Sequence, residues 1–185
     1  KPRQYYEMKE GHPHNSIFWG DAGPLRDGKG SIYEGGIRVP CIMRWPGKIS
    51  AGKTNDGLMA TLDLLPTFAA LARAKVPDNR IIDGVNQLDF LLGNSQSART
   101  SYIYNPGLAS VQTRILQGNA IREGDWKLIS PLKVGVFLED GGSGDWELYN
   151  LKEDIGESDN LATKYPRRVK RLKALLKSIE KDLTQ

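Results

Sequence analysis

Cysteine, histidine and long apolar runs are scarce in this sequence. Its 185 residues include a single cysteine, Cys41, and two histidines, His12 and His14. A single cysteine excludes an internal disulfide but does not decide the redox compartment. No apolar run approaches the roughly 20 residues that a membrane-spanning helix requires, so we expect no membrane partner. The opening residues, KPRQYY, lack the apolar segment of a signal peptide.

What is present is the composition of a globular protein with one strongly basic end. Hydrophobic residues make up 39% and charged residues 26% of the chain, whose 185 residues suffice for one ordinary domain or for a part-domain plus a small one. Residues 164–185 hold eight lysines and arginines against two acids, so this end carries +6 and the rest −2. We interpret it as the solvated face of a terminal helix. The alternative is that this basic face contacts a polyanion, either a glycan or nucleic acid. Of these two, we do not expect nucleic acid to be a partner.

The most informative stretch is Gly23–Pro46, which reads GPLRDGKGSIYEGGIRVPCIMRWP. Lys29 lies between two glycines, on a loop where its ammonium group can reach an anion. Gly35 and Gly36 predict a turn. The alternation of apolar residues over Ile37–Met43 predicts a strand that enters a core.

Four other polar residues in the first part of the chain could have structural or functional roles. Glu34 and Arg38 flank the Gly-Gly turn, and we expect them to pair with each other; a role in orienting Lys29 is the alternative. His12 and His14 are spaced to ligate a metal or to shuttle protons. Since no third ligand lies near them, we interpret them as ordinary loop histidines.

The middle of the chain predicts a helix and then a boundary. Asp63 is expected to cap the helix, which tolerates Pro66 in its first turn. The polar residues Asn94–Ser97 predict a domain boundary. The helix is expected to bury one apolar face in the core, made of Leu65, Phe68, Leu71 and Ala72.

The second half predicts a small antiparallel sheet followed by a helix. Glu123-Gly124-Asp125 predicts a hairpin turn, and Lys152–Leu161 predicts a solvated acidic loop. Pro166 is expected to start a terminal helix whose apolar stripe packs on the sheet, while Trp126 and Trp146 cover a sheet face. The runs expected to form strands are 102–104, 118–121, 126–129, 134–138 and 146–149.

Several ordered motifs resemble one enzyme family. Besides GPLRDGKGSIYEGGIRVP and RWPGKI, they are LDLLPT, DGV, REGDWKL and ELYNL. In this order, over about residues 20–175, they resemble the segment near the end of the catalytic domain of type I sulfatases, the arylsulfatase branch of the alkaline-phosphatase-like superfamily. The resemblance implies that residues 1–93 form the C-terminal part of an α/β catalytic domain. It implies that residues 94–185 form an α+β subdomain with a small antiparallel sheet and a terminal helix.

The resemblance also implies an activity, the hydrolysis of aryl or carbohydrate sulfate monoesters. In the family, a hydrated formylglycine made from the cysteine of Cys-x-Pro-x-Arg attacks sulfur, and Ca²⁺ holds the sulfate. Lys29 matches the family lysine that binds a sulfate oxygen. His12, His14 and Arg38 are further substrate-binding candidates. The expected ligand is a sulfated small molecule or glycan.

The chain departs from the family pattern in two places. Cys41 is followed by Ile-Met-Arg and lacks the motif proline, and the Asp-Asn-Gly that normally precedes this region is absent. We therefore expect the C-terminal portion of a sulfatase, inactive alone, whose nucleophile and calcium ligands lie in a missing N-terminal half. Without that half, Ile37–Met43 and Leu62–Leu71 should expose apolar surface.

Two alternatives differ in function. One is a non-catalytic module that binds sulfated polysaccharide through the basic helix or the tryptophan-bearing sheet. The other is a phosphomonoester or phosphonate hydrolase of the same superfamily. By resemblance, the compartment is periplasmic, secreted or lysosomal.

Overall fold

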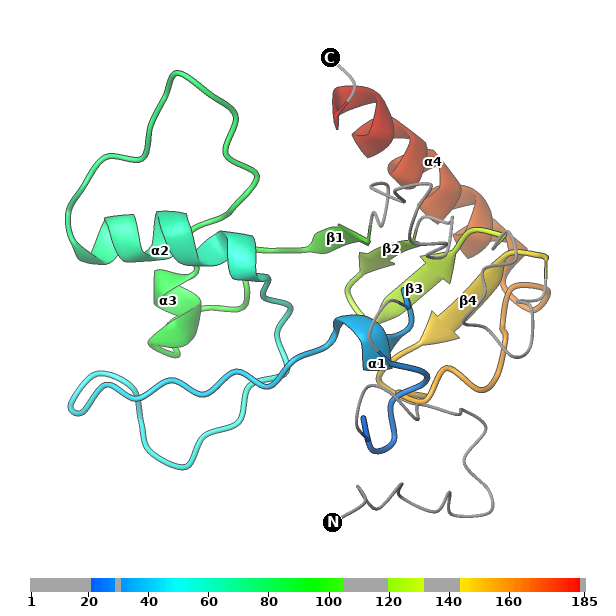
Figure 1. Cartoon of the computed structure of the whole chain (residues 1–185), viewed down its shortest axis with the longest axis horizontal. Helices are drawn as coiled ribbons and strands as arrows, with labels where there is room; N and C mark the ends of the chain where they lie inside the picture. Colours follow the sequence, from blue (N-terminus) through cyan, green and yellow to red (C-terminus); the bar gives the residue numbers. More distant parts are fainter. Residues whose placement is uncertain (1–20, 29–30, 105–119, 132–143, 184–185) are drawn as a thin grey trace, which may run out of the picture. The chain divides into compact units, whose positions relative to one another are not determined.

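The computed structural model describes residues 21–28, 31–104, 120–131 and 144–183, and the chain forms two compact units (Figure 1). One unit is residues 40–102, and the other joins residues 1–39 to residues 103–185. The boundary after residue 93 concerns the domains of a larger protein and stays a prediction. Within the described ranges, no helix combines the length and the apolar character needed to span a bilayer.

The main feature of the discontinuous unit is a four-stranded sheet in the order β1-β2-β3-β4 (Figure 1). β2 and β3 form an antiparallel hairpin around Gly124, whose φ of 57° favours glycine, and β3 and β4 are also antiparallel. The predicted strands are confirmed to within two residues, except 134–138, which lies outside the described residues. The strands are β1 (Ser101–Tyr104), β2 (Ala120–Glu123), β3 (Trp126–Ile129) and β4 (Glu147–Asn150).

One face of this sheet is apolar and carries the C-terminal helix. Ile121, Leu128 and Leu148 lie opposite one another across β2, β3 and β4 and are fully buried. Helix α4 (Pro166–Leu183) packs against β2 and β3 and adds Leu172 and Leu176 to this core. The predicted terminal helix and its packing on the sheet are confirmed. Trp126 and Trp146 are half-buried against the same core.

The opposite face of the sheet is polar. Because successive strand residues point to opposite sides, Arg122, Lys127 and Tyr149 form a second row, one position away from the apolar row in β2, β3 and β4. Helix α1 (Glu34–Ile37) and the loop before it contact this row through Glu34 and Arg26. The sheet therefore lies between α4 and the segment that contains Arg26 and α1.

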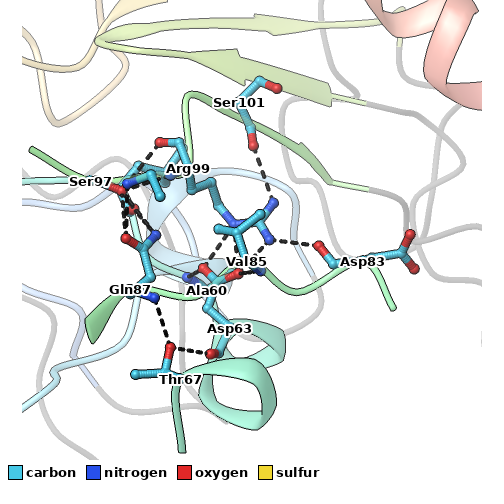
Figure 2. Close-up of polar contacts among 11 residues, drawn as sticks. Ala60, Asp63, Thr67, Asp83, Val85, Gln87, Ser97, Arg99 and Ser101 are labelled. Atoms are coloured by element: carbon cyan, nitrogen blue, oxygen red, sulfur yellow. Dashed lines mark hydrogen bonds and ion pairs between the residues drawn. The ribbon is translucent and has the colours of Figure 1, made fainter. Parts of the chain in front are cut away.

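The second unit is held together by a buried carboxylate. It contains η1 (Thr61–Asp63), α2 (Leu64–Leu71) and α3 (Leu88–Leu91). The Asp63 side chain does not cap α2 as expected. It accepts the N–H groups of Ala60 and Val85, each at 2.9 Å, and pairs with Arg99 (Figure 2). The carboxylate is fully buried and joins three segments of the chain.

Two further side chains extend the network around Asp63. The Thr67 hydroxyl donates to the Asp63 carbonyl at 2.6 Å and accepts the Gln87 N–H at 2.9 Å (Figure 2). The Gln87 side chain in turn binds Ser97 and the N–H of Ala98. These groups satisfy one another's hydrogen bonds, so we assign the network a structural role.

Two expectations about apolar segments are wrong. Ile37–Met43 is not a strand, because it has no neighbouring strand to pair with among the described residues, and Ile42 is 94% exposed. The apolar face of α2 is not in the core, since Leu65, Phe68 and Leu71 are all exposed. Both observations confirm the expectation that this chain bares apolar surface in these two segments.

Candidate functional site

Three of the four predicted site residues, Lys29, His12 and His14, lie outside the described residues. The fourth, Arg38, directly follows α1, and its guanidinium lies 3.9 Å from Glu34 with 42% of the side chain exposed. The predicted pairing of Glu34 with Arg38 is confirmed as a long contact between an exposed arginine and a buried glutamate. The binding roles of all four residues stay predictions.

The residues on either side of Lys29 and Gly30 are held in place. The Gly28 N–H donates to the Asp27 side chain at 2.8 Å, and the Ser31 N–H donates to the Gly28 carbonyl at 3.1 Å. Ser31, Ile32, Tyr33 and Glu34 are all buried. Both flanks of the predicted sulfate-binding lysine are therefore buried and carry local hydrogen bonds.

The two glycines of α1 let this helix lie directly on the loop. A Cβ at Gly35 would collide with the carbonyl oxygens of Asp27 and Arg26, and a Cβ at Gly36 with those of Ser31 and Gly28. Close backbone approach, rather than a positive φ, thus requires glycine at both positions. The expected turn is a single helical turn seated on both flanks of Lys29.

The first tie between this segment and the sheet is a buried ionic cluster, here called the lysine clamp, made of Glu34, Lys127 and Glu157. Lys127 of β3 is 0% exposed, and its Nζ lies 2.9 Å from Glu34 Oε1 and 2.9 Å from Glu157 Oε1. The contact with Glu157 is an ion pair without the alignment of a hydrogen bond. The Tyr104 ring lies 4.6 Å from the same ammonium group and adds a cation–π contact.

Glu157 is the unusual member of the lysine clamp. Its backbone has a φ of 51°, in the left-handed region that a glutamate rarely adopts, and its Oε2 accepts the Glu34 N–H at 2.6 Å. Burial raises the pKa of Glu157, an effect that the nearby Lys127 ammonium opposes without cancelling. The expectation that residues 152–161 form a solvated loop is therefore wrong at Glu157, which is fully buried.

The second tie, here called the arginine clamp, is made of Arg26, Tyr33, Glu147 and Tyr149. Glu147 Oε2 accepts the hydroxyls of Tyr33 at 2.8 Å and Tyr149 at 2.7 Å. The Arg26 guanidinium donates to the Tyr149 hydroxyl at 2.9 Å, lies 3.5 Å from Glu147 and stacks 3.8 Å over the Tyr33 ring. Burial and the Glu147 carboxylate raise the pKa of Tyr33, so this phenol stays a hydrogen-bond donor.

Sequence reasoning missed the partners that complete both clamps. Lys127 and Glu147 carry a usable signal, because each is a charged residue inside an apolar strand run that also belongs to a family-like motif. Glu157 gives no such signal, since it stands among other acidic and polar residues. Its partner Lys127 is 30 positions away, and only the folded chain brings them together.

The described residues do not fit the calcium and formylglycine chemistry that the resemblance implies. Within the described ranges, no group of three or more His, Cys, Asp or Glu side chains is placed to hold a metal ion. Cys41 is exposed and stands in Cys-Ile-Met-Arg, without the motif proline. No catalytic step through either group is therefore assigned to these residues.

A second feature with binding potential is a basic groove at the start of α4. It has a volume of about 490 Å³. Arg168 lies 4.3 Å over the Trp126 ring, and Arg171 pairs with Glu123 at 2.6 Å. The first turn of α4 holds no acidic residue. The groove is lined by Lys164, Tyr165, Pro166, Arg167, Arg168 and Arg171.

Comparison with known proteins gives consistent matches. A family model described as N-sulphoglucosamine sulphohydrolase, C-terminal, matches residues 27–184. N-acetylgalactosamine-6-O-sulfatase of Bacteroides thetaiotaomicron is 32% identical over 182 residues, which cover 96% of this chain and 32% of that protein. Arylsulfatase A of Homo sapiens is 43% identical over 151 residues, which cover 77% of this chain and 29% of that protein. The chain thus spans about a third of the length of these relatives.

Solved structures match the fold as well. One, described as part of the metabolism of multiple glycosaminoglycans by Bacteroides thetaiotaomicron, has a TM-score of 0.68 at 30% identity and covers 85% of this chain and 32% of its own. Another, in complex with its substrate D-glucosamine-2-N,6-O-disulfate, has a TM-score of 0.53 at 28% identity and covers 75% of this chain and 27% of its own.

Proposed function

Because this chain belongs to the sulfatase family, matching the family's C-terminal domain, we propose that it serves in the hydrolysis of sulfate monoesters. The observation that carries the proposal is the family match over residues 27–184, which takes in Lys29 with its two flanking glycines, the lysine clamp and all of the arginine clamp except Arg26. The role we assign to the chain is to supply Lys29 to the sulfate group. The nucleophile and the calcium ligands come from polypeptide that precedes this sequence.

The chemistry of the loop supports a sulfate-binding role for Lys29. Sulfuryl transfer places negative charge on the oxygens around sulfur, and an ammonium group held in advance at that place stabilises this charge. An ammonium group works best there if it does not have to be ordered during the reaction, and the hydrogen bonds of its neighbours Gly28 and Ser31 support such a role. Arg38, half-exposed just after α1, is a further candidate for contact with the substrate.

The substrate class we propose is a sulfated sugar or an aryl sulfate. Among the relatives, one is named for N-acetylgalactosamine 6-O-sulfate and another for aryl sulfates, and one similar structure holds a disulfated glucosamine. A phosphomonoester or phosphonate substrate is the alternative within the same superfamily. By the same reasoning we place the whole protein in a periplasmic, secreted or lysosomal compartment.

The test of the proposed function is Lys29→Ala in the full-length sulfatase. We expect kcat/KM for 4-nitrophenyl sulfate or a 6-sulfated sugar to fall about 10²–10³-fold, because one preorganised donor to the developing charge is lost. The melting temperature should stay unchanged. Lys53→Ala, which removes an exposed loop lysine of the same chain, is the matched control. Wild-type kinetics in Lys29→Ala would remove this lysine from the site.

The basic groove favours one second function, the binding of a sulfated polysaccharide. Four cations and an aromatic ring lie together there, which suits a sulfated chain with apolar sugar faces. In solution, this chain should then bind chondroitin sulfate but not the unsulfated hyaluronan. Arg167→Glu should weaken binding several-fold more than Lys177→Glu, which makes the same charge change farther along α4. Equal losses would mean that only net charge matters.

A further inference from the structure

We propose that the C-terminal sheet takes part in catalysis by positioning, because the lysine clamp and the arginine clamp together hold the segment that carries Lys29. This inference rests on the proposed function of Lys29. It assigns positioning roles to Tyr33, Glu34, Lys127 and Glu147. None of these four is proposed to touch the substrate.

The two clamps attach to the chain on both sides of Lys29. Arg26 lies three residues before Lys29, while Tyr33 and Glu34 lie four and five residues after it. The arginine clamp holds Arg26 and Tyr33 against Glu147 of β4, and the lysine clamp holds Glu34 against Lys127 of β3. The segment is therefore tied to the sheet on both sides of the lysine, by strands far away in sequence.

The clamps also resist movement of this segment relative to the sheet. Glu34, Glu147, Glu157 and Lys127 are all buried, and a buried charge that loses its partner is strongly disfavoured. A shift of the segment relative to the sheet would separate several of these pairs at once. Gly35 and Gly36 also bring α1 into close backbone contact with the carbonyl oxygens of residues 26–28 and 31. The clamps thus do more than stabilise the fold, since they hold Arg26, Tyr33 and Glu34, on the two sides of Lys29, against the sheet.

The positioning role predicts a moderate fall in kcat when one contact of the clamps is removed. Catalytic groups act within narrow distance limits, and a displacement of about 1 Å can cost about 10²-fold in rate. Tyr33→Phe removes one hydroxyl between loop and sheet and leaves Glu147 its bond from Tyr149. We therefore expect a fall in kcat of about tenfold, smaller than the effect of removing Lys29 itself.

The matched control is Thr67→Val in the Asp63 network. Tyr33 and Thr67 are 1% and 0% exposed, and each variant deletes one buried hydroxyl from a polar cluster. Both variants should lower the melting temperature of the full-length sulfatase to a similar degree. Only Tyr33→Phe should lower kcat. Tyr149→Phe, which removes the same kind of contact from the strand side, should reproduce the effect of Tyr33→Phe.

The decisive measurement is a double-mutant cycle between Tyr33→Phe and Lys29→Ala. If Tyr33 acts by positioning Lys29, Tyr33→Phe has no further effect on kcat once Lys29 is alanine. If the two losses multiply, or if Tyr33→Phe behaves like Thr67→Val, the positioning role is wrong while the proposed function stands. If Lys29→Ala alone has wild-type kinetics, the proposed function fails first, so the two failures are distinguishable.

Discussion

Asp63 and Glu157 are two fully buried carboxylates that respond to burial in opposite directions. Burial alone would raise the pKa of Asp63, but hydrogen bonds from Arg99 and from the N–H groups of Val85 and Ala60 outweigh it and lower the pKa. At Glu157, burial outweighs the attraction of Lys127, and the pKa is raised. The raised pKa of Glu157 therefore favours folding at acid pH, and this contribution is lost as the pH rises through the folded-state pKa.

Asp63 gives a pH prediction at the scale of one residue. Because its pKa is lower in the folded state, its contribution to stability is present above the unfolded pKa of about 3.9 and is lost as the pH falls through the folded value. Asp63→Asn should cost about 3 kcal/mol at pH 7, since it breaks a buried ion pair. The difference from wild type should shrink below about pH 4. Urea unfolding across this range measures it, and a constant difference would contradict it.

At the scale of elements, the sheet has one face for packing and one for ionic contacts. Its apolar row meets α4, and its polar row meets the segment around α1. The loss in the free energy of unfolding caused by a substitution should therefore depend on the row to which the residue belongs. On the α4 side, truncating a buried apolar side chain leaves a cavity, which lowers the free energy of unfolding.

Leu172→Ala tests the packing of α4. Leu172 is fully buried between α4 and the sheet, so we expect a loss of about 2–5 kcal/mol in the free energy of unfolding. Lys177→Ala, at an exposed position of the same helix, should change it by less than about 0.5 kcal/mol. Chemical denaturation of both variants is the measurement. Similar values for the two would mean that α4 is not part of the core.

The elements that could be predicted from sequence are those whose pattern is local. The hairpin around Gly124 and the stripe of α4 are set by turn residues and by periodicity, and both are confirmed. Ile37–Met43 has the alternation of a strand, but no strand lies beside it among the residues that the structure describes. The alternation alone was therefore insufficient to predict a strand. Lys127 and Glu157 of the candidate site depend on partners far away in sequence, which no local pattern reveals.

At the scale of the whole molecule, the apolar surface of residues 40–102 is the main anomaly. Ile42, Leu65, Phe68 and Ile81 are all exposed, which is unusual for side chains of this size in one unit. The relatives are about three times as long as this chain. We infer that the rest of a sulfatase covers this surface.

Phe68→Ser should accordingly have opposite effects in two contexts. Phe68 is 53% exposed here, so its replacement should reduce self-association of this chain in sedimentation velocity experiments. In the full-length sulfatase, where we expect Phe68 to be covered, the same change should cost about 3 kcal/mol or more. Lys75→Ser is the control for both. Reduced association without any loss in the long protein would show that this surface stays uncovered.

The spacing of the clamp partners has a consequence for biosynthesis. Glu34 meets Lys127 after 93 residues and Glu157 after 123 residues. A ribosome adds about 5–20 residues per second, so a nascent chain carries Glu34 without these two partners for on the order of 5–25 s. Until strands β3 and β4 are made, the segment around Lys29 is not tied to the sheet, and a premature stop codon before Lys127 makes that condition permanent. Such truncated chains should be substrates for chaperones and proteases even when every residue of the loop itself is intact.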